Sequence, residues 1–135
     1  MVVSRKFKLI IGSILVVALL LVYFFFDPTA TDSYFPGCPL YNTTGIYCPG
    51  CGSQRALHSL LHLDFKSVLS YNLLFIPATG VVLYNVFVRI YNRVSSRQIP
   101  NVIYTKTFAI IVLIVILIFW VLRNLPIHPF NHLAP

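Results

Sequence analysis

The stretch LIIGSILVVALLLVYFFF, residues 9–26, contains no charged side chain and is almost entirely apolar. Arg5, Lys6 and Lys8 precede it. A basic start before an apolar run is also typical of a secretory signal peptide, but the apolar part of such peptides spans only about 7–15 residues. Because a helix needs about 20 mainly apolar residues to cross a bilayer, and because aromatic residues favour its interface, the stretch predicts a retained transmembrane helix.

Two further uncharged runs follow, at residues 68–88 and 107–122. The first of them contains Pro77, which removes a backbone donor and is expected to bend the helix. The second is short, but Ile103, Tyr104 and a snorkelling Lys106 extend it to spanning length. The three runs predict an all-α integral membrane protein with three transmembrane helices and one short amphipathic interfacial helix.

The composition supports a membrane protein, since 58% of the residues are hydrophobic and only 10% are charged. A soluble domain has about 45–50% apolar and about 25% charged residues. Asp27, Asp32 and Asp64 are the only acidic residues. So few carboxylates argue against a glycosidase-like acid pair and against a carboxylate-rich Mg²⁺ or Ca²⁺ site. The net charge of +7 arises from basic residues at segment ends, so no nucleic-acid partner is expected.

The basic residues also predict an orientation, because cytoplasmic segments carry an excess of Lys and Arg. Seven of the ten lie before the first run or in residues 89–106, and the other three are Arg55, Lys66 and Arg123. We therefore expect a cytoplasmic N-terminus, a cytoplasmic loop at 89–106, and an outside location for both residues 27–67 and the tail.

The outside part divides into three segments. Residues 27–52 are rich in proline and glycine and predict a loop. Residues 53–66 lack helix breakers and place apolar residues on one face, which predicts an interfacial helix leading into the second span. The tail, 123–135, contains three prolines and is expected to be extended. The whole chain, 1–135, is expected to form a single membrane domain.

All three cysteines, Cys38, Cys48 and Cys51, lie in the predicted outer loop. Cys48 and Cys51 form a C-x-x-C pair at the start of a helix, where unpaired N–H groups stabilise a thiolate, and Arg55 adds a cation one turn later. Three interpretations remain open: a structural disulfide, a thiol–disulfide redox pair with Cys38 as a third partner, and a zinc site.

A zinc site requires a fourth ligand besides the three thiolates, and His58 is the candidate. At 1.5 Å per residue, His58 lies about 10 Å along the predicted helix from Cys51. It reaches the metal only if the loop folds back over the helix. His62 lies about 16 Å away and is a weaker candidate.

The segment from Cys38 to Asn72 resembles a family of small bacterial membrane proteins catalogued as domain of unknown function 2752. The resemblance covers about residues 38–88 and rests on the string T-G-x-x-C-P-x-C-G-x-x-R-A, which here runs from Thr44 to Ala56. Gln54 stands where the family usually has threonine, and Leu73 follows Asn72 where proline is frequent. The resemblance implies a bacterial inner-membrane location and no assigned activity.

These features lead to two functional hypotheses. The first is a non-enzymatic accessory or scaffold subunit, whose Cys-Arg motif shapes an outer-face docking surface. The alternative is a membrane thiol–disulfide redox or zinc-binding protein that uses Cys48 and Cys51, with Cys38 assisting. Besides the lipid bilayer, a homo-oligomer or a larger membrane complex is the expected partner, because Asn72 and Asn85 require polar neighbours inside a membrane.

Overall fold

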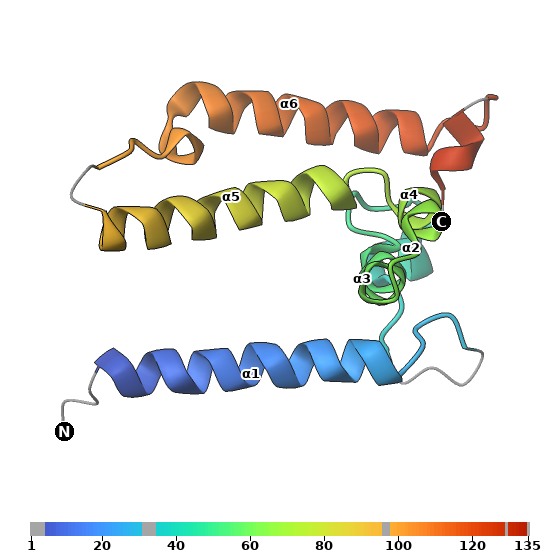
Figure 1. The fold of residues 1–135 in the computed structure, drawn as a ribbon. Coiled ribbons are helices and arrows are strands. Elements are labelled where there is room, and N and C mark those ends of the chain that lie inside the picture. Colours follow the sequence, from blue (N-terminus) through green and yellow to red (C-terminus); the bar gives the residue numbers. More distant parts are fainter. Residues whose placement is uncertain (1–4, 31–34, 96–97, 129, 135) are drawn as a thin grey trace.

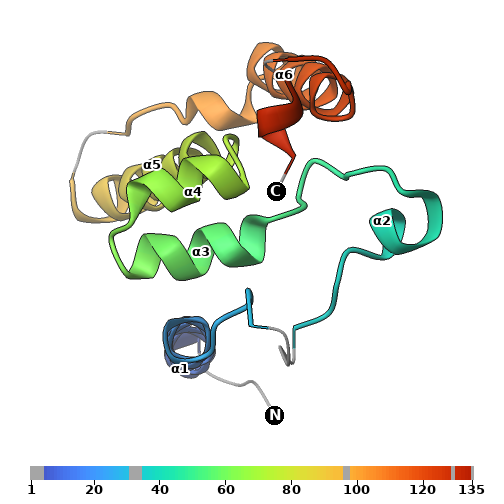
Figure 2. The same cartoon turned by 90° about the vertical axis from the view of Figure 1, so that its right-hand side faces the viewer.

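A computed structural model describes residues 5–30, 35–95, 98–128 and 130–134. Within them the regular elements are all helical: α1 (Arg5–Phe25), α2 (Pro39–Thr44), α3 (Ser53–Leu61), α4 (Phe65–Tyr71), α5 (Phe75–Val94), η1 (Val102–Tyr104), α6 (Lys106–Arg123) and η2 (Phe130–Leu133). Figure 1 shows the long helices α1, α5 and α6 roughly parallel, with α2, α3 and α4 gathered at one end. The end-on view in Figure 2 agrees with this arrangement. The all-helical class is therefore confirmed.

Three transmembrane helices were expected, but one or two of the described helices are long and apolar enough to cross a membrane. Among the described residues, only α6 is long and apolar enough by itself, and α4 with α5 would make a second span if the bent pair is counted as one. The apolar part of α1, Ile10–Phe25, is a shorter helix. The predicted third helix, 107–122, is confirmed as a helix and extends by one residue at each end.

The prediction of a single helix over residues 68–88 is wrong, because this segment belongs to two helices. It is divided into α4 and α5, which meet at an angle of 108°. The break lies at Asn72, whose backbone is extended, and not at Pro77. Pro77 is the third residue of α5. The first four N–H groups of a helix have no intrahelical acceptor, so proline is tolerated there without a bend.

The interfacial helix expected over residues 53–66 is also wrong in its extent. α3 ends at Leu61, and Leu63 adopts the left-handed conformation with φ 60°. Asp64 then caps α4 by accepting a hydrogen bond from the Ser67 amide at 3.2 Å. An N-capping aspartate ends one helix and begins the next, a signal that side-chain periodicity alone does not reveal.

Smaller differences concern the predicted loops. The outer loop contains the short helix α2, and the tail contains η2. On the opposite side, α5 continues to Val94, so the loop expected at 89–106 begins later and includes η1. Asn101 caps η1 and also donates to Asn85 Oδ1 at 2.9 Å, which gives Asn85 a polar neighbour within the chain.

Burial is concentrated at the end where α3 and α4 meet α5 and α6. The buried residues there include Cys51, Ala56, Val68, Asn72 and Arg123. Along the long helices, by contrast, large apolar side chains such as Leu15, Leu83 and Ile110 are more than half exposed. This apolar surface is far more than a soluble monomer of this size normally exposes.

Candidate metal centre and its polar frame

The C-x-x-C segment forms a tight turn that leads directly into α3. The Cys51 amide donates to Cys48 O at 3.1 Å, and the Ser53 amide donates to Gly50 O at 3.0 Å. Gly52 is the N-cap of α3 and has φ 80°, in the left-handed region. A side chain at this position would strain the backbone, so glycine after Cys51 lets the turn continue into the helix.

The structure brings all three cysteines together. Cys48 Sγ lies 3.2 Å from Cys51 Sγ and 3.4 Å from Cys38 Sγ. The three sulfur atoms lie within 4.8 Å of one another, and all three residues are free thiols. Cys51 is buried, whereas Cys38 and Cys48 are half-buried. Cys38 comes from the N-cap position of α2, so the loop folds back to place it against the C-x-x-C turn.

The three thiols do not share one environment. The pKa of Cys38 is lowered to about 7, chiefly by the hydrogen bond with Cys51 and then by the Tyr41 amide. The pKa of Cys51 is raised to about 12, chiefly by burial and then by its hydrogen bonds with Cys38 and Cys48. In the absence of a metal, Cys38 is therefore the more readily ionised of these two thiols.

Asn72 holds the turn from the side of α4 and α5. It is 2% exposed, and its amide nitrogen donates to Pro49 O at 3.0 Å, Cys51 O at 3.2 Å and Ser53 Oγ at 3.1 Å. Its carbonyl oxygen accepts from the Leu74 amide at 3.0 Å. The expectation that Asn72 needs a polar neighbour is thus met by the cysteine turn. The same residue breaks the helix and anchors the turn.

Asn124 and Arg123 hold the turn from the end of α6, and neither was among the predicted site residues. Asn124 pairs with the backbone of Tyr47, accepting from its amide at 2.8 Å and donating to its carbonyl at 3.0 Å. Arg123 is 1% exposed and donates to Cys48 O and Pro49 O, both at 3.4 Å, and to Tyr71 O at 3.1 Å. The cation at the turn is therefore Arg123.

The sequence contained a signal for these two residues. They follow directly on an uncharged run, where a polar side chain lies at interface depth and needs partners. From the sequence alone Arg123 indicates only topology, because no local motif connects it with a turn 75 residues earlier.

Arg55 and His58, two further candidates, face other groups. The Arg55 guanidinium lies 6.0 Å from the centre of the Tyr71 ring, and its side chain is exposed. His58 Nδ1 lies 2.8 Å from Tyr23 O at the end of α1. The His58 ring contacts His62, which in turn stacks on Phe24 at 4.5 Å. In the described part of the chain, the potential metal-ligand cluster comprises the three cysteines without His58.

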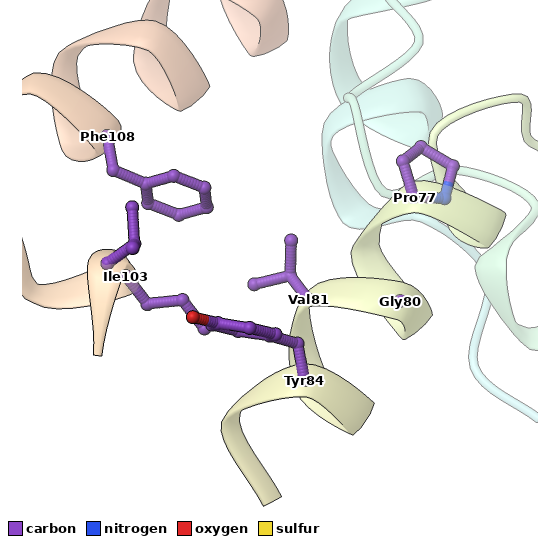
Figure 3. Close-up of a pocket in the computed structure, with 7 residues that line it drawn as sticks. Pro77, Gly80, Val81, Tyr84, Ile103 and Phe108 are labelled. Atoms are coloured by element: carbon purple, nitrogen blue, oxygen red, sulfur yellow. The ribbon is translucent and has the colours of Figure 1, made fainter. Parts of the chain in front are cut away.

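Two apolar pockets lie between α5 and α6. One, of about 340 Å³, begins at Pro49 and Gly50 of the cysteine turn and continues between the two helices. The other, of about 460 Å³, lies toward the opposite end (Figure 3), where Tyr84 of α5 faces Ile103 and Phe108. The two pockets share Pro77 and Val81. Their walls contain no charged side chain. The polar side chains that line the smaller pocket, Ser53 and Asn72, bond to each other at 3.1 Å, so neither pocket adds a charged ligand to the cysteine cluster.

With this geometry in place, the comparison with protein families identifies the segment that contains the site. Residues 38–86 match the model of a family described as "Protein of unknown function (DUF2752)". The match confirms the resemblance inferred from the loop motif, and it extends from Cys38 through the turn and Asn72 into α5. Neither the curated proteins nor the solved structures include a significant match to the chain.

Proposed function

We propose that this chain is an integral protein of the bacterial inner membrane that binds Zn²⁺ through Cys38, Cys48 and Cys51. The convergence of the three sulfur atoms within 4.8 Å carries the proposal. In a tetrahedral site with Zn–S bonds of about 2.3 Å, the sulfur atoms stand about 3.8 Å apart. The two shorter separations, 3.2 and 3.4 Å, therefore require only small side-chain rotations to admit the ion.

A metal accounts for the third cysteine better than a redox pair does. Cys48 and Cys51 alone suffice for thiol–disulfide exchange. A tetrahedral zinc ion would use all three thiolates and take its fourth ligand from outside the cysteine cluster, for example a water molecule. Backbone groups also favour thiolate charge, since the Cys48 amide donates to Cys51 Sγ at 3.2 Å. The role proposed for the ion is structural: it fixes the outer loop as the docking surface of a non-catalytic accessory subunit.

The membrane part of the proposal has three spans, α1, the α4–α5 pair and α6, with the cysteine turn outside. The large exposed apolar side chains on all three long helices support it. The distribution of basic residues supports a cytoplasmic N-terminus. Reporter fusions after Lys106 and after the tail test this topology; an external reporter after Lys106 would overturn the orientation.

Metal analysis of detergent-purified full-length protein tests the zinc site. We expect about one Zn²⁺ per chain, with loss of the metal in Cys38→Ser, Cys48→Ser and Cys51→Ser. His58→Ala serves as a matched control, because His58 bonds to Tyr23 and lies outside the cluster. Retention of full zinc by all three serine variants would exclude the site.

A second candidate, thiol–disulfide exchange, is favoured by the central position of Cys48. Its sulfur has a partner on either side, Cys51 at 3.2 Å and Cys38 at 3.4 Å. A disulfide formed by Cys48 with one partner could be transferred to the other by attack of the third thiolate. Differential alkylation of metal-free protein in a glutathione buffer series distinguishes this candidate: alternative Cys48 disulfides at envelope potentials would favour exchange over metal binding.

A further inference from the structure

Arg123 is the most deeply buried charged residue in the described part of the chain, with 1% of its surface exposed. Its two terminal nitrogens donate to the carbonyl oxygens of Cys48, Pro49 and Tyr71. Its guanidinium also lies 5.2 Å from the centre of the Phe119 ring. These contacts engage the two terminal nitrogens, whereas the buried Nε has no hydrogen-bond partner among the described residues. Carbonyl oxygens and rings carry no net charge.

A buried guanidinium needs a counter-charge, because it stays protonated in proteins and is unfavourable in an apolar site without one. The two aspartates that the structure describes are engaged elsewhere. Asp27 accepts from Thr29 at 2.7 Å, and Asp64 caps α4 through Ser67. Within the residues that the structure describes, the counter-charge must therefore come from another kind of group.

Two kinds of ionisable group lie beside Arg123. Its guanidinium lies 5.9 Å from the centre of the Tyr47 ring, and it donates to the backbone of Cys48, whose sulfur belongs to the cysteine cluster. The Tyr47 phenol donates its proton to the Tyr41 hydroxyl in a hydrogen bond of 3.3 Å, so it carries no charge in this structure. The cysteine thiolates remain. Their cluster and Arg123 converge on the same turn from different ends of the chain.

We infer that Arg123 is the counter-cation of the cysteine cluster and a positioning residue for the proposed zinc site. The inference rests on the proposed function and deepens it. Three thiolates contribute a charge of −3, a divalent ion +2 and Arg123 +1, so the occupied site is neutral. Electroneutrality lets three ionised cysteines occur together at the end of apolar helices without a carboxylate or a second metal.

Two substitutions, Arg123→Lys and Arg123→Gln, separate the effect of charge from that of hydrogen bonding. The Zn²⁺ affinity of each variant is measured by chelator competition on the detergent-purified full chain. Lysine keeps the charge but loses the planar fork, and glutamine keeps polar reach but loses the charge. We expect Lys to bind Zn²⁺ within about threefold of the unsubstituted chain, and Gln to lose roughly tenfold or more. Arg55→Gln, which removes an exposed arginine, is the matched control and should leave affinity unchanged.

The two hypotheses fail in different ways. Absence of zinc from the unsubstituted chain would overturn the proposed site itself. Unchanged affinity in Arg123→Gln would leave the site intact and overturn the role of Arg123. Equal losses in the Lys and Gln variants would assign Arg123 to hydrogen bonding and likewise overturn the counter-cation.

A double-mutant cycle on thermal stability keeps the inference testable even if Arg123→Gln weakens folding. In the unsubstituted chain with zinc, Arg123→Gln should lower the melting temperature. In a chain with all three cysteines replaced by serine, Arg123 has lost its counter-charge, so the same substitution should be neutral or stabilising. An equal loss in both backgrounds would show that Arg123 acts independently of the cysteines.

Discussion

At the scale of single residues, the side chain of Asn72 both donates and accepts hydrogen bonds at the junction of α4 and α5. One carboxamide satisfies two backbone carbonyls and a hydroxyl of the cysteine turn, and also accepts from the amide of Leu74. An aliphatic residue of similar size would leave those groups buried and unpaired. This explains why a polar residue occupies the junction of α4 and α5.

Replacing Asn72 with alanine is expected to destabilise the protein by about 2–4 kcal/mol, because buried backbone groups lose their partners. Denaturation of the purified chain in detergent measures the change. Asn92→Ala is the matched control, because Asn92, near the end of α5, also bonds to backbone, but its partner Ile99 lies in an exposed loop. There we expect a loss below about 1 kcal/mol; equal losses at the two positions would contradict the assignment.

The pKa values of Cys38 and Cys51 predict that these two thiols react at different rates in the reduced, metal-free protein. Because the pKa of Cys38 is about 7, its thiolate fraction rises roughly tenfold between pH 6 and 8 and then levels off. Cys51, with a pKa of about 12, stays protonated throughout this range and its labelling continues to increase at higher pH. Alkylation followed by peptide mass analysis at several pH values measures both profiles. Faster labelling of Cys51 than of Cys38 at pH 7 would contradict the order.

At the scale of elements, the junction between α3 and α4 depends on one residue in an unfavourable conformation. Leu63 has φ 60° and is 73% exposed, so its side chain gains little from packing while its backbone is strained. The Asp64 amide bonds to Ser59 O at 2.9 Å, which fixes this geometry. The reversal turns α4 back toward the cysteine site instead of extending α3 along the surface.

Leu63→Gly is therefore expected to raise stability by roughly 0.5–1 kcal/mol, since glycine adopts positive φ without a Cβ penalty. Thermal melting of the variant in detergent measures the effect. Leu69→Gly is the matched control, because Leu69 is also exposed but lies within α4, where glycine costs about 1 kcal/mol. Destabilisation at Leu63 of the same size as at Leu69 would show that the turn is not strained.

At the scale of the whole molecule, the cysteine turn joins elements that are otherwise far apart. Asn72 connects it with α4 and α5, whereas Arg123 and Asn124 connect it with α6. α1 is attached to the same end through α3, where His58 bonds to Tyr23 O. A metal bound to the turn would therefore stabilise the arrangement of helices and not only the loop.

Removal of metal is accordingly expected to lower the melting temperature of the whole protein, by linkage of zinc binding to the folded state. The comparison is between melts with excess Zn²⁺ and with chelator. Cys48→Ser should melt at one temperature under both conditions, since it lacks the central ligand. A chelator effect of equal size in Cys48→Ser would assign the stabilisation to zinc bound elsewhere.

Asn124→Ala tests the connection between the turn and α6 without touching a cysteine. The change removes both bonds to the Tyr47 backbone, and we expect a loss of about 1–3 kcal/mol together with faster proteolysis after α6. Limited proteolysis and melting measure the two effects. Unchanged protection would show that Arg123 alone holds the end of α6.

Much of the fold followed from local pattern. The first and third uncharged runs predicted α1 and α6, and the C-x-x-C spacing with the following glycine identified the turn, because helix periodicity and turn chemistry depend on neighbouring residues. The bend predicted at Pro77 was wrong, because the effect of a proline depends on its position within the helix, and the sequence pattern did not define where α5 begins. The division between α3 and α4 at Leu63 was not predicted, because the surrounding contacts impose the positive φ of this leucine and the local sequence does not indicate it.

The amino-acid sequence by itself determined the helical class, the apolar surface and the grouping of three cysteines in one loop, since each follows from composition or short spacing. Only the tertiary structure decided which groups meet that loop. In it, Cys38 contacts the C-x-x-C turn, and Arg55 lies over the ring of Tyr71. Arg123 and Asn124 bond to the turn although they lie more than 70 residues away in the sequence. The physical reason is that hydrogen bonding and charge pairing act through space, and the partners of a buried group are selected by packing.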